Sequence, residues 1–231
     1  MVQSKVSGKV YLNICEFIGS VFLVIAAVSP MILIINVLHA SVALAVLADA
    51  IAVGFVLFAL IEIFGPICTA YFNPAVSIGM AIVKDISWKQ ALRYSVYQIL
   101  GGLTGVILSH LMFYDTIPTI AEISSISRSG GSYIAEILGT FILVLCILSL
   151  VHQKSSKVSL VVGFLVSGML LSTASTMFAN PQVTLARMFT YSAAGIHPVD
   201  GFIFIVMQFI GVILAVLTWR FGVVPCSCSV N

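Results

Sequence analysis

Apolar positions fill most of the chain in six stretches of roughly 20 residues or more, the length that lets a helix cross a bilayer. Short polar or charged segments separate them. We therefore predict membrane-spanning helices over about 10–38, 43–65, 89–113, 132–151, 158–177 and 200–221. Two further apolar runs, about 74–83 and 181–190, are too short to cross and are expected to be re-entrant half-helices.

Each short run begins with an asparagine and a proline. With the residue that follows, the two motifs are Asn73, Pro74 and Ala75, and Asn180, Pro181 and Gln182. Proline is favoured at the first position of a helix because its missing N–H would have no partner there, and asparagine is a good N-cap. One such motif alone would be an ordinary cap. Two of them in an apolar chain predict half-helices that meet inside the membrane beside a water-filled pore.

The composition agrees with an integral membrane protein. Hydrophobic residues make up 61% of the chain and charged residues 8%, against about 25% charged in soluble domains. We expect residues 1–231 to form one all-α membrane domain, and the net charge of +2 gives no indication of nucleic-acid binding.

The five cysteines and four histidines are dispersed, so neither a disulfide framework nor a metal site is expected. No pattern suggests an enzyme or a cofactor. Cys226 and Cys228 are expected to be two free thiols in the tail. The alternative is that they bind a metal or carry a lipid.

The chain consists of two similar halves. Two motifs occur once in each half, in the same order around the asparagine-proline motif. They are Glu-x-x-Gly at Glu16 and Glu136, and Gln-x-x-Gly at Gln98 and Gln208. The halves, about 10–113 and 132–221, each hold three spans, an odd number, so their orientations must be opposite. The polar segment of about 114–131 is expected to link them outside the membrane.

The distribution of lysine and arginine predicts the orientation. Six spans put both termini on one side, with eight of the ten basic residues: Lys5, Lys9, Lys84, Lys89, Arg93, Lys154, Lys157 and Arg220. The other side has Arg128 and Arg187. We therefore expect cytoplasmic termini in a multi-pass protein of the cell membrane.

These motifs resemble those of the aquaporin, or major intrinsic protein, family over nearly the whole chain. The resemblance implies six helices and two half-helices in inverted repeats, a homotetramer with one pore per subunit, and passive conduction of water or small neutral solutes. It also implies that Glu16 and Glu136 brace the re-entrant loops by accepting backbone N–H bonds, with Gln98 and Gln208 as further supports. The alternative for the two intramembrane carboxylates is a proton relay.

The pore chemistry follows from the paired amides. Asn73 and Asn180 would each direct an NH₂ group into the pore, so a passing water accepts from both and its own hydrogens point outward. That arrangement interrupts proton transfer along a water chain, and the positive ends of the half-helices repel cations. Backbone carbonyls of residues 69–72 and 176–179 are expected to supply acceptors on the other wall.

The sequence departs from the family pattern at the second motif. Gln182 replaces the usual alanine, which puts the local packing in doubt. Val183 stands where most members have an arginine, while Arg187, one helical turn later, could point along the same face. The segments 186–190 and 194–196 resemble a bacterial subgroup associated with arsenic resistance.

In the family the selectivity filter lies at fixed offsets from the two asparagines, so the resemblance implies filter positions at Val53, Gly168, Met177 and Val183, with Arg187 as a further candidate. These four positions have no aromatic ring, so we expect a wide, weakly polar constriction. It would pass water, glycerol and arsenous acid, which is neutral at pH 7 and similar in size to glycerol. A strictly water-selective channel and a closed-pore scaffold or adhesion protein are the alternatives.

Three further carboxylates are placed by their position in the spans. Asp49 and Asp200 fall near span ends and are expected at the membrane interface. Glu62 would either line the inner vestibule or reach the interface.

Overall fold

A computed structural model describes residues 8–223, so the predictions for Lys5, Cys226 and Cys228 lie outside the described range. Helices and connecting segments make up this part of the chain. The α-helices are α1 (Gly8–Met31), α2 (Val42–Phe64), α3 (Pro74–Ile82), α4 (Trp88–Leu111), α5 (Gly131–His152), α6 (Val158–Ser172), α7 (Pro181–Arg187) and α8 (Pro198–Thr218). Two π-helical stretches, Ile32–Val37 and Trp219–Val223, continue α1 and α8.

The helix boundaries agree with the predicted ranges, with one clear difference. The two short runs fold as α3 and α7, and the six longer helices correspond to the predicted spans. However, α6 ends at Ser172 rather than near residue 177. The reason lies in the backbone, because Thr176, Met177 and Ala179 adopt φ angles of 56°, 34° and 45°, which no right-handed helix can include.

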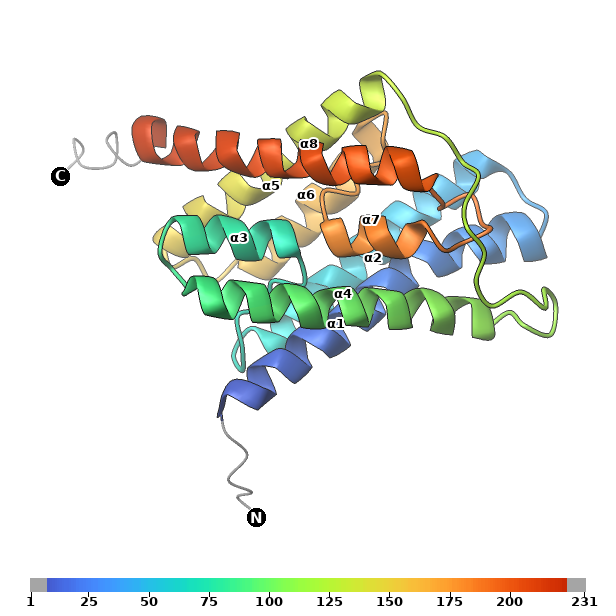
Figure 1. The fold of residues 1–231 in the computed structure, drawn as a ribbon, viewed down its shortest axis with the longest axis horizontal. Coiled ribbons are helices and arrows are strands. Elements are labelled where there is room, and N and C mark those ends of the chain that lie inside the picture. The colour runs from blue at the N-terminus through green and yellow to red at the C-terminus, as the bar shows by residue number, and fades with distance from the viewer. Residues whose placement is uncertain (1–7, 224–231) are drawn as a thin grey trace, which may run out of the picture.

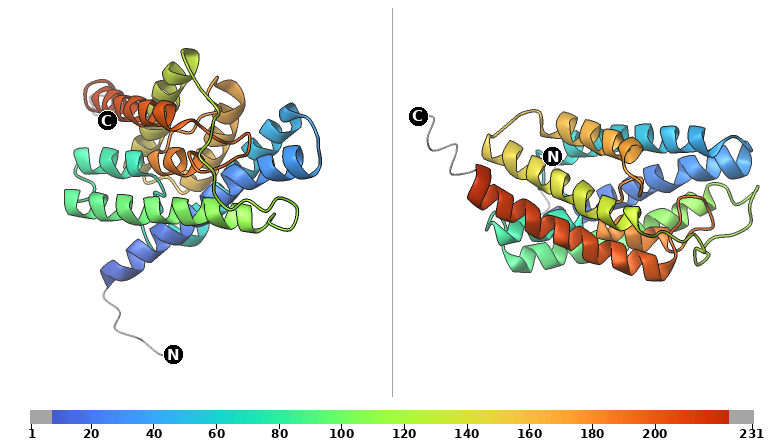
Figure 2. Two further views of the ribbon diagram at one scale, coloured as in Figure 1. Left: turned by 45° about the vertical axis from the view of Figure 1, so that its right-hand side comes forward. Right: turned by 90° about the horizontal axis from the view of Figure 1, so that it is seen from above.

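The six long helices form a bundle, and the two short helices lie within it (Figure 1). α1 begins and α8 ends toward one end of the bundle, which we call the termini side, and the opposite end is the far side (Figures 1 and 2). α3 lies toward the termini side and α7 toward the far side, with their N-terminal ends near the middle of the bundle. This arrangement is the one that two oppositely oriented halves produce.

Helix pairing repeats the same symmetry. α1 packs against α4 in the first half, α5 packs against α8 in the second, and α2 packs against α6 between the halves. The glycine of each Gln-x-x-Gly motif lies at a crossing. A Cβ on Gly101 would lie 2.4 Å from the carbonyl oxygen of Phe17, and one on Gly211 would lie 2.6 Å from that of Ile137. A larger residue at either position would force the helices apart, as at other close helix contacts in membranes.

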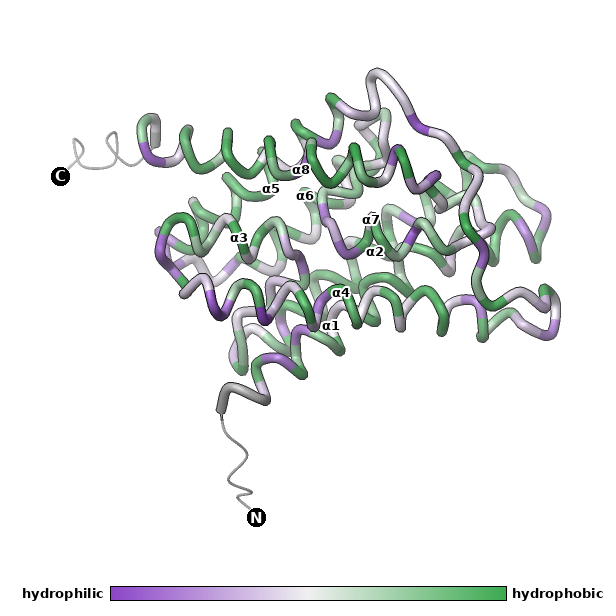
Figure 3. Tube along the Cα trace, in the orientation of Figure 1, coloured by the Kyte–Doolittle hydropathy of each residue, from purple (hydrophilic) through white to green (hydrophobic). Residues whose placement is uncertain are grey.

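The outer surface of the bundle is suited to lipid. Four segments are long and apolar enough to span a bilayer: Tyr11–Val37, Val42–Phe64, Gly131–His152 and Pro198–Gly222. α4 is of similar length but carries polar side chains, and α6 has 15 residues. Large apolar side chains face outward, and polar residues gather mainly in loops and at the two ends of the bundle (Figure 3). The fold is therefore an all-α, multi-pass membrane domain.

Candidate functional site

The two asparagines begin the half-helices, as their motifs predict. The side-chain oxygen of Asn73 accepts from the backbone N–H of Ala75 at 2.9 Å, and that of Asn180 accepts from Gln182 at 3.2 Å. A proline follows each asparagine at the first helical position. Because each oxygen is used for capping, the NH₂ group of each side chain is directed away from its own helix.

Each amide donates across the centre of the molecule to the loop of the other half. Asn73 Nδ2 donates to the carbonyl oxygen of Ala179 at 2.8 Å, and Asn180 Nδ2 donates to that of Phe72 at 2.9 Å. In each case the acceptor belongs to the residue directly before the other asparagine. The exchange holds the two helix starts together and leaves each NH₂ group with a second hydrogen.

Gln182 joins this exchange instead of disturbing it. Its side chain is fully buried, and Nε2 donates to the same Phe72 carbonyl at 3.2 Å. A Cβ on Gly102 of α4 would lie only 2.1 Å from the Oε1 atom of Gln182. The larger residue therefore fits because α4 has a glycine where the two helices meet, a compensation that sequence reasoning missed.

Glu16 holds the loop before α3. Its Oε1 accepts from the backbone N–H of Tyr71 at 2.9 Å, and its Oε2 accepts from that of Phe72 at 2.7 Å. Gln98 Nε2 donates to the same Oε2 at 2.7 Å and to the hydroxyl of Ser77 at 3.0 Å. The carboxylate is fully buried, and its hydrogen bonds tie α1 and α4 to the loop and to α3.

Glu136 makes the equivalent set of bonds before α7. It accepts from the backbone N–H groups of Phe178 at 2.9 Å and Ala179 at 2.8 Å. Gln208 Nε2 donates to Glu136 at 2.7 Å and to Thr184 Oγ1 at 2.9 Å. All four polar side chains of the two Glu–Gln pairs are thus buried and directed at the re-entrant loops.

The loops held by these carboxylates have an unusual backbone. Residues with positive φ are Ala70, Phe72, Thr176, Met177 and Ala179, with values between 34° and 56°. Residues other than glycine rarely adopt this conformation, and it persists where the surroundings impose it. Here Glu16 holds the first loop in this conformation and Glu136 holds the second, each through hydrogen bonds from backbone N–H groups of the loop.

Two narrow cavities share the asparagines, and each is lined by one of the two loops. The cavity on the far side has a volume of about 50 Å³, and the one on the termini side about 70 Å³. The residues common to both are Leu23, Leu57, Asn73, Leu143 and Asn180. Each volume is enough for a few water molecules. The walls are apolar apart from the amides, the loops and one arginine, which suits small uncharged polar molecules.

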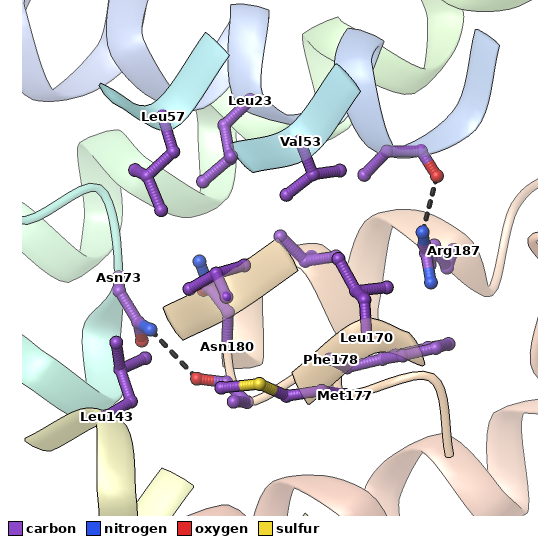
Figure 4. Close-up of a pocket in the computed structure, with 14 residues that line it drawn as sticks. Leu23, Val53, Leu57, Asn73, Leu143, Leu170, Met177, Phe178, Asn180 and Arg187 are labelled. Carbon is purple, nitrogen blue, oxygen red and sulfur yellow. Dashed lines mark hydrogen bonds between the residues drawn. The ribbon is translucent and has the colours of Figure 1, made fainter. Parts of the chain in front are cut away.

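Most of the predicted filter residues line the far-side cavity. Val53, Met177, Val183 and Arg187 all contribute to its wall (Figure 4). The figure draws Arg187 at one end of the cavity and Asn73 at the other. The side chain of Arg187 therefore reaches the cavity, although Arg187 lies one helical turn beyond Val183.

The placement of Gly168 in the filter is wrong. Gly168 is exposed, and a Cβ built on it would meet no atom within 4 Å. Val166 and Leu170 of α6 line the cavity instead. Two positions along a helix turn the side chain by about 200°, so Gly168 lies opposite these two residues.

Arg187 forms a buried ion pair that the sequence did not suggest. Its Nη2 donates to the carbonyl oxygen of Ala27 at 2.5 Å and to Asp49 Oδ2 at 3.2 Å. Its guanidinium carbon lies 4.3 Å from the ring centroid of Phe178. Asp49 is completely buried, so its predicted position at the membrane interface is wrong.

The other carboxylates lie outside the two cavities. Asp200 accepts from the backbone N–H of Arg128 at 2.8 Å and from the hydroxyl of Tyr133 at 2.9 Å, which anchors the linker. Glu62 is exposed on the termini side and accepts a hydrogen bond from Ser159. Within residues 8–223, no group of three or more His, Cys, Asp or Glu side chains is placed to hold a metal ion.

Comparison with known proteins agrees with this geometry. The sequence is 34% identical over 212 residues to the aquaglyceroporin AqpS of Rhizobium meliloti, covering 92% of this chain and 90% of that protein. It is 33% identical over 175 residues to a glycerol uptake facilitator protein of Streptococcus pneumoniae, covering 67% of this chain and 75% of that one. The X-ray structure of the aquaglyceroporin from Plasmodium falciparum matches the fold with a TM-score of 0.77 at 20% identity, covering 96% of this chain and 99% of that one. Residues 4–219 match the profile of the major intrinsic protein family, so the chain belongs to that family.

Proposed function

We propose that the protein is a passive channel that conducts water and glycerol across a cell membrane and excludes protons and ions. The observation that carries the proposal is the pair of narrow cavities that share Asn73 and Asn180. The relatives described as an aquaglyceroporin and a glycerol uptake facilitator support glycerol as a solute. Arsenous acid has a similar size and no charge at pH 7, so it is a further candidate.

The two asparagines would orient each passing molecule. One hydrogen of each NH₂ group is used in the bond to a loop carbonyl, and the other is free to donate toward the cavity. A water oxygen that accepts from both amides has its own hydrogens directed away from the centre. The hydrogen bonds along a chain of water molecules then do not all run in one direction, so protons would not be relayed through the pore.

The far-side cavity would select solutes by size and polarity. Val53, Leu170, Met177 and Val183 give an apolar wall, and Arg187 adds a cluster of N–H donors. A polyol can place its C–H groups on the apolar wall and its hydroxyls toward the donors. The absence of an aromatic ring at Val53 supports a constriction wide enough for glycerol.

The two Glu–Gln pairs would act as supports, not as proton carriers. Glu16 and Glu136 already accept from backbone N–H groups and from Gln98 and Gln208. A carboxylate saturated with donors in this way stabilises a loop conformation. Keeping the loop carbonyls in place would keep both asparagines aimed at the pore.

The position in the membrane is part of the same proposal. The excess of basic residues on the termini side supports cytoplasmic termini. A homotetramer with one pore per subunit is the assembly that the family resemblance implies. Cross-linking in native membranes would test the assembly, and labelling of a cysteine introduced in the linker would test the orientation.

Stopped-flow light scattering on proteoliposomes tests the proposed function. Water and glycerol permeability would be measured on one preparation, with protein-free vesicles as background. We expect both permeabilities to exceed the background. Fast water flux with glycerol at background would instead support a strictly water-selective channel. Flux of neither would support the closed-pore scaffold or adhesion protein.

A further inference from the structure

The far-side end of the pore contains one buried charge of each sign. Arg187 is 2% exposed and Asp49 is fully buried, and their side chains are 3.2 Å apart. Burying a single charge is costly, and a buried partner of opposite sign offsets that cost only when the contact is close. Arg187 lines the cavity, whereas Asp49 does not, so the carboxylate lies behind the guanidinium.

Three separate elements hold this guanidinium. Ala27 on α1 supplies a carbonyl oxygen, Asp49 on α2 supplies a carboxylate oxygen, and Phe178 in the second loop supplies a ring face. The hydrogen bonds to Ala27 and Asp49 are both donated by one nitrogen of Arg187, Nη2. Arg187 Nε has no hydrogen-bond partner within the described residues, so part of the guanidinium is left with donor capacity.

The ion pair of Asp49 and Arg187 lies one helical turn closer to the far side than the apolar constriction at Val53 and Val183. Asp49 lies four residues before Val53 on α2, and Arg187 lies four residues after Val183 on α7. Both valines line the cavity. A solute that enters from the far side therefore passes Arg187 before it reaches Val53 and Val183.

A second cation lies close to the first. The guanidinium carbon of Arg128, in the linker, is 5.8 Å from the centroid of the same Phe178 ring that Arg187 covers at 4.3 Å. Burial, with the charge of Arg187 as a further cause, lowers the pKa of Arg128. Among the ion pairs of the described residues, Asp49 is the carboxylate that contacts Arg187. Without it, Arg187 would face a like charge near Phe178 and lose a tether on the wall side.

We propose that Asp49 determines the solute selectivity of this channel by holding Arg187 against the pore wall and cancelling its charge. This inference rests on the proposed function. It states that Asp49 keeps the far-side entrance of the pore wide and without net charge. With Asp49 in place, the guanidinium is a fixed donor beside an open passage. Without its charge, the guanidinium extends into the cavity, where it obstructs glycerol more than water because glycerol is larger.

The test compares Asp49→Asn with wild-type protein in proteoliposomes. Asparagine keeps the shape of the side chain and removes its charge. We expect the ratio of glycerol to water permeability to fall roughly tenfold, the scale on which a small change in pocket size separates substrates. Glu62→Gln is the matched control, because it removes an exposed carboxylate from the same helix away from both cavities. Its ratio should equal that of the wild type.

The double variant Asp49→Asn/Arg187→Gln separates positioning from a general structural effect. It has no guanidinium to restrain, so we expect its permeability ratio to return at least to the wild-type value. A ratio that stays low in the double variant would overturn the inference. Should Asp49→Asn alone fail to fold, the double variant decides by the same criterion.

The remaining outcomes also distinguish this inference from the proposed function. Wild-type flux of both solutes with an unchanged ratio in Asp49→Asn would overturn the inference alone. Wild-type vesicles that conduct neither solute would overturn the proposed function, and the inference with it. The measured quantity is a ratio on one preparation, so differences in protein yield between variants do not change it.

Discussion

Gln182 and Gly102 share a space that has room for only one side chain. The Oε1 atom of Gln182 lies 2.1 Å from where a Cβ on Gly102 would stand, and Gln182 Nε2 donates to the carbonyl oxygen of Phe72. The unusual glutamine of the second motif is thus matched by a glycine on α4. The same glutamine adds a third amide to the contact between the two half-helices.

Replacing Gly102 with alanine should destabilise the protein. The added methyl overlaps Gln182, and overpacking of this kind typically costs about 1–3 kcal/mol. We expect a lower midpoint of thermal unfolding in detergent and substantial recovery in Gly102→Ala/Gln182→Ala, which removes the overlapping atoms. Gly168→Ala is the control, because an added Cβ there meets no atom within 4 Å. Equal melting of Gly102→Ala and the wild type would contradict the packing.

A tryptophan at Val53 should reduce glycerol flux more than water flux. Val53 lines the far-side cavity, whose volume is about 50 Å³, so a bulky ring there leaves little room for a three-carbon solute. We expect a loss of glycerol permeability of about tenfold or more. The same substitution at Gly168 is the matched control and should leave flux unchanged, because Gly168 is exposed. Unchanged glycerol flux in Val53→Trp would remove Val53 from the filter.

Exchanging Glu136 for glutamine should weaken the second re-entrant loop. The amide has one acceptor oxygen where the carboxylate had two, so one buried N–H of Phe178 or Ala179 loses its partner. Such a loss costs about 1–3 kcal/mol. We expect lower thermal stability and reduced water flux, measured together. Glu122→Gln, an exposed carboxylate of the linker, should change neither. Full water flux in Glu136→Gln would argue against the supporting role.

An aspartate at Asn180 should open the pore to protons and cations. The carboxylate lacks the donor that bonds to the Phe72 carbonyl and places a negative charge at the start of α7. We expect proton leak into vesicles, followed with an internal pH-sensitive dye, to rise about tenfold, which corresponds to ~1.4 kcal/mol of barrier. The inverted repeat predicts a similar effect for Asn73→Asp. Leak at the wild-type level in both variants would contradict the proposed role of the amides.

Local sequence determined most of the architecture. Span lengths follow from the thickness of the bilayer, and the half-helix starts follow from the capping chemistry of Asn73 and Asn180. The same repeated motifs identified Glu16, Glu136, Gln98 and Gln208 as one set, and the structure directs all four at the re-entrant loops. These features depend on short-range patterns, which a sequence displays directly.

Tertiary structure alone decided which residues line the far-side cavity. Gly168 was misplaced because counting from Asn180 does not determine how α6 is rotated about its axis, and Val166 and Leu170 face the cavity instead. The ion pair of Asp49 and Arg187 joins residues 138 positions apart. Side-chain contact across that separation depends on how α2 and α7 pack in three dimensions, and no local pattern records it.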